Sequence, residues 1–198
     1  MHRPALFALC LAAAPALAEE TTSLGAHEHG VGALNVAFDG ARIAMELHAP
    51  GADIVGFEHP AKSAEDKAAV TAAKDVLTAP LTLFAFSEAA GCTVDAVEVA
   101  LEFEGADGHA DGHGHDHGHA HDHGHGHDHE AEGGHSEFHA EYALTCANPG
   151  AIAALMTEGY FTAFPAAREL EVQIAGPGGS AGFELSAEVP AAVIGGLM

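Results

Sequence analysis

The sequence predicts an α+β fold with a mostly antiparallel sheet, two helices, and a long disordered histidine-rich insertion at a hairpin tip. Three observations support this prediction. Several short segments alternate between apolar and polar side chains, as strands with one buried face do. Two other segments carry helix-start signals. Residues 105–134 contain no large apolar side chain that could anchor a core, so we expect them to form a flexible loop.

The first hairpin is predicted from residues 33–38 and 42–48, which both alternate. Asp39-Gly40 between them is a dipeptide that favours a type I′ turn. Two closing strands are predicted at 169–174 and 182–188, joined by the turn-like Gly-Pro-Gly-Gly of residues 176–179.

The first helix is predicted over residues 64–78. Ser63 and Asp66 resemble a capping box at its start, and Pro80 follows its end. Residues 81–86 form a short apolar run that we interpret as a strand.

A second helix is predicted to begin at Asn148-Pro149, a cap followed by proline. Gly159 is expected to end it. Its buried stripe would consist of Ile152, Leu155 and Met156.

A second hairpin is predicted from residues 94–104 and 135–146, with residues 105–134 at its tip. Its expected inward side chains are Val97, Val99, Leu101, Phe103, Phe138, Ala140, Tyr142 and Leu144. Cys92 and Cys146 lie at its far end, where a disulfide would tie the strands together, and in an oxidising compartment that is favoured over a metal site. Because the alternation gives the two cysteines opposite parity, a bulge is needed to pair them.

Residues 1–18 read as a signal peptide, with a basic Arg3, an apolar stretch and an Ala16-Leu17-Ala18 cleavage motif. We therefore expect a periplasmic protein without membrane insertion after cleavage, in which residues 19–198 form a single metal-binding domain. The chain has 29 acidic against six basic residues, a formal charge of −23. That charge argues against nucleic-acid and anionic-membrane partners and favours cations.

The strongest functional signal lies between residues 109 and 129. Neutral imidazole is a common ligand for zinc and related ions, and a glycine-rich backbone can wrap several imidazoles around one ion. Ten histidines would satisfy roughly three ions at four ligands each. The expected ligands are His109, His113, His115, His117, His119, His121, His123, His125, His127 and His129. The affinity order for an all-nitrogen site favours copper or nickel over zinc, so the metal stays open at this point.

A second candidate site lies on the strand after the insertion. His135, Glu137 and His139 share one face at period two, about 6–7 Å apart per step, with Glu102 and Glu104 expected beside them. The alternative is an ordinary exposed polar strand face. Other histidines that could complete a site, though singly each is more often a surface residue, are His27, His29, His48 and His59.

Five features are spaced along the chain: HEHG at residues 27–30, GFEHP at 56–60, Cys92, the pattern His135-x-x-x-His139-x-x-Tyr142-x-x-x-Cys146, and Phe161-x-x-Phe164-Pro165. Together they resemble the ZrgA-like family of periplasmic zinc-binding proteins. The resemblance implies zinc as the metal, a part in high-affinity zinc uptake alongside an ABC importer, and structured ligands among His27, His29, His59, His135 and His139.

Three classes of function compete. The first is a protein that captures zinc for uptake, and the second is a periplasmic buffer or detoxification protein for nickel or copper. The third is a zinc hydrolase, which we do not expect because the chain has no HExxH helix, nucleophile motif or dedicated general base. Since histidines protonate near pH 6.5, metal loading by any of these proteins should collapse between about pH 7 and 5.

Overall fold

A six-stranded sheet in the order β3-β4-β2-β1-β6-β7 dominates the computed structural model, which describes residues 28–103 and 135–198. Within it, β1 and β6 are parallel and the other neighbouring strands antiparallel, so the expected α+β, mostly antiparallel architecture is confirmed. Its strands are β1 (Val31–Asp39), β2 (Arg42–Pro50), β3 (Cys92–Phe103), β4 (Ser136–Cys146), β6 (Glu169–Gly176) and β7 (Gly179–Leu185). A second, two-stranded sheet pairs β5 (Ala154–Met156) with β8 (Ala191–Val193).

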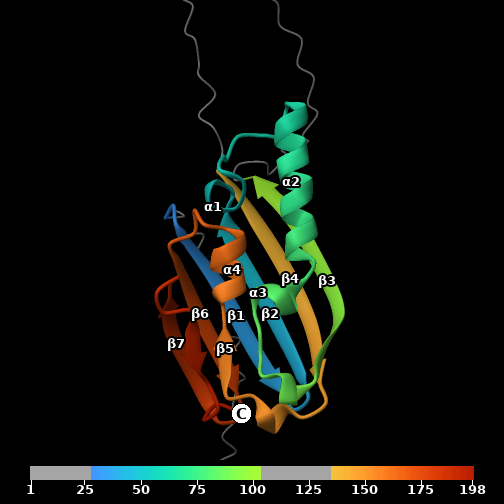
Figure 1. Ribbon diagram of the computed structural model, residues 1–198, viewed down its shortest axis with the longest axis vertical. Coiled ribbons are helices and arrows are strands. Elements are labelled where there is room, and N and C mark those ends of the chain that lie inside the picture. Colours follow the sequence, from blue (N-terminus) through green and yellow to red (C-terminus); the bar gives the residue numbers. More distant parts are fainter. Residues whose placement is uncertain (1–27, 104–134) are drawn as a thin grey trace, which may run out of the picture.

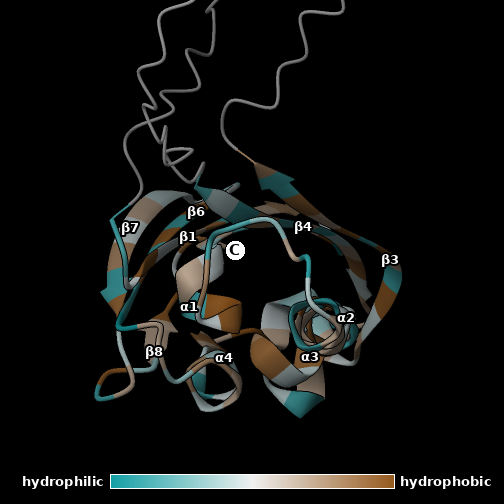
Figure 2. Ribbon diagram, turned by 90° about the horizontal axis from the view of Figure 1, so that it is seen from above, coloured by the Kyte–Doolittle hydropathy of each residue, from teal (hydrophilic) through white to brown (hydrophobic). Residues whose placement is uncertain are grey.

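The helices gather on one face of the curved sheet, which arches over them in Figure 2. They are α1 (Gly51–Val55), α2 (Ala64–Leu77), α3 (Pro80–Leu83) and α4 (Glu158–Ala163), with short 3-10 turns η1 (Glu88–Ala90) and η2 (Pro149–Ala151). The core fills the space between this face and the helices, and Leu34, Leu47 and Phe138 are fully buried in it. The opposite face carries the polar half of each alternating strand. None of the helices in the described ranges is long and apolar enough to cross a membrane.

Both predicted hairpins are present, and Figure 1 shows their strands side by side. The turn of the first differs from the prediction, because Asp39 pairs with Arg42 and the two loop residues are Gly40 and Ala41. Gly40 has a φ of 61° and no non-glycine residue of the described part has a positive φ. A positive φ at the first loop position only is typical of a type II′ turn, whereas type I′ requires it at both.

Cys92 and Cys146 form a disulfide, as predicted. They face each other in the register of β3 and β4, and the register shifts between Val94 and Ala96. This irregularity is the bulge that the opposite parity of the two cysteines required, since one extra residue reverses the side on which the following side chains point.

The prediction of a helix from residue 148 was wrong. Residues 154–156 form β5 instead, because they find a strand partner in β8, and the helix of this region starts only at Glu158. Gly159, the expected helix end, lies inside α4. A side chain at Gly159 would collide with the carbonyl of Thr82 in α3, so the glycine is needed for close packing of the two helices.

The strand predicted for residues 81–86 was also wrong. Pro80 occupies the first turn of α3, where its fixed φ and missing N–H suit a helix start. After Phe84, a single bridge from Ala85 to Met156 replaces the expected strand. The predicted signal peptide and histidine-rich loop lie outside the described residues.

Candidate metal centres

Within residues 28–103 and 135–198, two groups of histidine and glutamate side chains bring their ligand atoms within 4.8 Å of one another. The loop cluster consists of His29, Glu58 and His135. The strand cluster consists of Glu46, His48 and His139. Each group offers two imidazoles and one carboxylate, which is a donor set suited to zinc.

The loop cluster forms at the end of the sheet where β1 and β4 begin and β2 ends. His29 lies in the turn before β1, Glu58 follows α1, and His135 directly precedes β4. Glu58 bridges the histidines: its Oε1 is 2.9 Å from Nε2 of His29 and its Oε2 is 2.6 Å from Nδ1 of His135. One carboxylate therefore links chain segments more than 70 residues apart.

Glu58 is the least exposed member of the loop cluster, with a side chain 14% exposed. Burial raises the pKa of its carboxyl, but the adjacent imidazoles of His135 and His29 outweigh this and hold the pKa below its usual value. Its Oε1 is buried and, although close to His29, makes no well-directed hydrogen bond within the described part of the chain. A buried carboxylate oxygen that receives no hydrogen bond is suited to binding a cation.

The backbone beside His29 is held by two residues outside the cluster. Asp53 of α1 is buried, and both its carboxylate oxygens accept from the N–H of Gly30, at 2.8 and 3.0 Å. Arg168 donates a side-chain hydrogen bond to the carbonyl of His29, and its backbone N–H donates to the carbonyl of Gly30. The imidazole of His29 is thus carried on a fixed turn.

Replacing Asp53 with alanine should lower the free energy of unfolding by about 1–3 kcal/mol, since the buried N–H of Gly30 would lose its acceptor. It should also weaken zinc binding, because the turn carrying His29 would loosen. Chemical denaturation and zinc titration measure the two effects. Asp75→Ala, at an exposed position of α2, is the control and should change neither. Unchanged zinc affinity in Asp53→Ala would show that this turn does not position His29.

The strand cluster lies on the helix-free face of the sheet. Glu46 and His48 are two residues apart on β2, and His139 is the register partner of His48 on β4. Oε1 of Glu46 lies 3.1 Å from Nε2 of His139 and 3.3 Å from Nε2 of His48. A hydrogen bond from His139 is the main reason that the pKa of Glu46 is lowered.

His135, Glu137 and His139 share one face, as predicted, but they do not converge on a single point. His135 joins the loop cluster and His139 the strand cluster, while Oε2 of Glu137 lies 3.3 Å from Nδ1 of His48. The reason is the extended backbone: four residues of a strand span about 13 Å, too far for ligands of one ion.

His59 belongs to neither cluster. It is exposed, its ring stacks on Phe57 with centroids 4.6 Å apart, and its Nδ1 lies 3.3 Å from the carbonyl of Pro60. His27, Glu104 and the ten histidines of residues 109–129 lie outside the described residues. Glu46 and Glu58 were not among the ligands predicted from the sequence. Two sequence signals could have identified them. Glu58 lies next to His59 within GFEHP, and Glu46 lies two residues before His48 on the same strand face.

In the part of the chain that the structure describes, these features define an α+β domain with two candidate metal-binding clusters and the Cys92–Cys146 disulfide. The model of the ZrgA family of zinc uptake proteins matches residues 26–193. The chain therefore belongs to the ZrgA family, and its role is connected with zinc, the ion that this family takes up. No curated protein matches the chain.

Proposed function

We propose that this chain is a periplasmic zinc-binding protein that captures Zn²⁺ and supports high-affinity uptake by an ABC importer, without enzymatic activity. The observation that carries the proposal is the loop cluster, in which Glu58 joins His29 and His135 in a chain of a zinc uptake family. The Cys92–Cys146 disulfide and the apolar N-terminal segment support an oxidising compartment reached by secretion.

The proposal assigns different tasks to the two parts of the chain. Imidazoles at every second position from His113 to His129 would collect ions quickly and release them readily. The loop cluster is attached to a disulfide-linked sheet, so its ligands are held near one another before the ion arrives, which reduces the ordering cost of binding. Collection by the tract and retention by the folded domain together suit a protein that passes ions on.

Replacing the ten histidines between His109 and His129 with glutamine should remove most of the bound zinc equivalents, roughly three of them at four ligands per ion. The ions held by the folded domain should remain, with the thermal unfolding temperature unchanged. Calorimetric titration of the full-length variant beside the wild type measures both stoichiometry and affinity. An unchanged stoichiometry would contradict the collecting role of the tract.

A buffer or detoxification protein for nickel or copper is the second candidate, favoured by the all-nitrogen donors of the tract. The two imidazoles and one carboxylate of each folded cluster match a donor set found in zinc sites, and the family match also points to zinc. Expression separates the two: an uptake protein should be induced by a zinc chelator, and a buffer by excess metal. Growth of a deletion strain in chelator, restored by wild type but not by Glu58→Gln, would support uptake.

A further inference from the structure

The strand cluster has the surroundings of a built metal site. Its three ligands come from β2 and β4 at the middle of a six-stranded sheet, so their backbones are fixed by hydrogen bonds on both sides. The imidazoles of His48 and His139 lie side by side, with ring centroids 4.5 Å apart and planes tilted by 33°. Both present Nε2 to the same carboxylate oxygen of Glu46.

The other nitrogen of each imidazole faces a second carboxylate. Nδ1 of His48 lies 3.3 Å from Oε2 of Glu137, within hydrogen-bond distance. Nδ1 of His139 lies 4.0 Å from Oε1 of Glu102. Histidines that bind metal through one ring nitrogen usually donate the other N–H to a carboxylate, carbonyl or water, which fixes the ring and makes it a better ligand.

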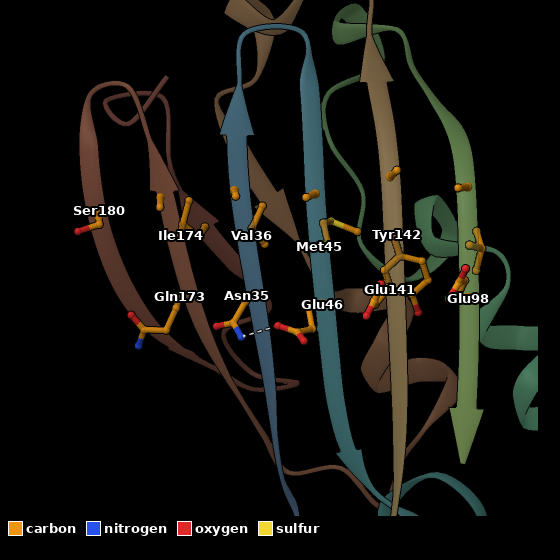
Figure 3. A pocket seen from close by; sticks show the side chains of 16 residues that line it. Asn35, Val36, Met45, Glu46, Glu98, Glu141, Tyr142, Gln173, Ile174 and Ser180 are labelled. Atoms are coloured by element: carbon orange, nitrogen blue, oxygen red, sulfur yellow. Dashed lines mark hydrogen bonds between the residues drawn. The ribbon is translucent and has the colours of Figure 1, made fainter. Parts of the chain in front are cut away.

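Glu46 is oriented in the same way, because its Oε2 accepts a hydrogen bond from Nδ2 of Asn35 at 3.3 Å, which leaves Oε1 directed at the two imidazoles. Figure 3 shows this bond between neighbouring strands β1 and β2. Glu46 and His48 therefore each have a hydrogen-bonded outer partner, and Glu102 lies at the longer distance of an ion pair from His139.

The spacing also fits an ion. Two ligands at 2.0–2.1 Å from a tetrahedral zinc lie about 3.3 Å apart. The contacts of Glu46 with His139 and His48, 3.1 and 3.3 Å, are already close to that value. The corresponding contacts of the loop cluster, 2.9 and 2.6 Å, would have to widen by several tenths of an ångström.

Three protein ligands leave one coordination position, which lies toward solvent because the side chains of Glu46, His48 and His139 are 43, 32 and 22% exposed. Glu46 also borders a hollow of about 570 Å³ on the helix-free face, visible in Figure 3. An exogenous ligand or water can reach the ion from that side.

We propose that Glu46, His48 and His139 form a second binding site for a divalent transition-metal ion of the zinc type, independent of the loop cluster. The site goes beyond the proposed function, since capture at the loop cluster does not require it. Its ion would keep one exchangeable coordination position. The folded domain then holds two ions, one at the loop cluster and one at the strand cluster.

Imidazole nitrogen resonances of the full-length, ¹⁵N-labelled protein test the site during a Zn²⁺ titration at neutral pH. Signals of His48 and His139 are assigned by His48→Gln and His139→Gln. Zinc should shift Nε2 of both residues and leave Nδ1 protonated, facing Glu137 and Glu102. The same shifts should appear in His29→Ala, in which the loop cluster is broken but the strand cluster is complete.

Glu137→Gln should weaken zinc at the strand cluster by about 10–100-fold, the usual cost of losing an outer carboxylate. Glu98→Gln is the matched control, an exposed glutamate of β3 on the same face, and should leave the affinity unchanged. If excess zinc leaves the imidazole nitrogen resonances of His48 and His139 unshifted in folded wild-type protein, the two histidines only form surface ion pairs, and the proposal fails. Shifts that vanish in His29→Ala would overturn its independence.

Discussion

Glu58→Gln is expected to weaken zinc binding at the loop cluster by roughly a hundredfold or more, because even losing an outer partner of a metal ligand costs about 10–100-fold. The carboxylate contacts both His29 and His135, at 2.9 and 2.6 Å. Glutamine keeps the size of the side chain but loses its charge and replaces one acceptor with a donor. The affinity of the tightest site, measured by competition with a zinc chelator, should fall accordingly.

The matched control for this variant is Glu184→Gln, an exposed glutamate of β7 that should leave zinc affinity at the wild-type value. Circular dichroism of the metal-free proteins shows whether both remain folded. A folded Glu58→Gln protein with wild-type affinity would show that the tightest zinc site lies elsewhere in the chain.

Replacing both cysteines of the disulfide with alanine should lower the free energy of unfolding by about 4 kcal/mol. The bridge joins residues 54 positions apart, and closing a loop of that length removes about this much conformational entropy, expressed as free energy, from the unfolded chain. Cys146 is also buried, so the side chains at this position contact the core. Denaturant unfolding at neutral pH measures the difference.

The double alanine variant is compared with wild-type protein unfolded in the presence of a reductant. The reduced wild type lacks the disulfide but keeps both cysteine side chains. The two should show similar losses. A loss below about 1 kcal/mol in both would mean that the unfolded chain is already compact around these strands.

Much of the sheet could be predicted because alternation fixes which side chains are buried. The inward side chains predicted for the strand that became β4, from Phe138 to Leu144, are all buried in the structure. Even the disagreement between the parities of Cys92 and Cys146 was informative, since it required the bulge found between Val94 and Ala96.

Elements that depend on a distant partner were less predictable. Residues 154–156 have apolar side chains that suit a helix or a strand, and only their pairing with residues 191–193 decides between the two. The run at 81–86 is similar: the helix-start preference of Pro80 outweighed its apolar composition.

The candidate ligands were predicted only in part, because their grouping also depends on strands that are distant in the sequence. The periodicity of β4 placed His135 and His139 on one face, but it could not show that β2 is the neighbouring strand. That neighbour places His48 opposite His139 and brings Glu46 with it. Strand order is a property of the whole sheet, so local patterns of 10 or 12 residues do not contain it.

Choosing His59 rather than Glu58 has a different cause. Both follow α1 in a loop, where there is no period that assigns a side to each residue. The structure turns Glu58 toward His29 and His135, while His59 stacks on Phe57. The family resemblance pointed to His59 within GFEHP, whereas the structure groups its neighbour Glu58 with the two histidines.

The most direct measurement of the central claim is the location of zinc by anomalous scattering in crystals of the zinc-loaded full-length protein. We expect an ion about 2.0–2.2 Å from ligand atoms of Glu58, His29 and His135, the usual zinc distances to oxygen and nitrogen ligands. Crystals of zinc-saturated protein with no ion between these three side chains would contradict it.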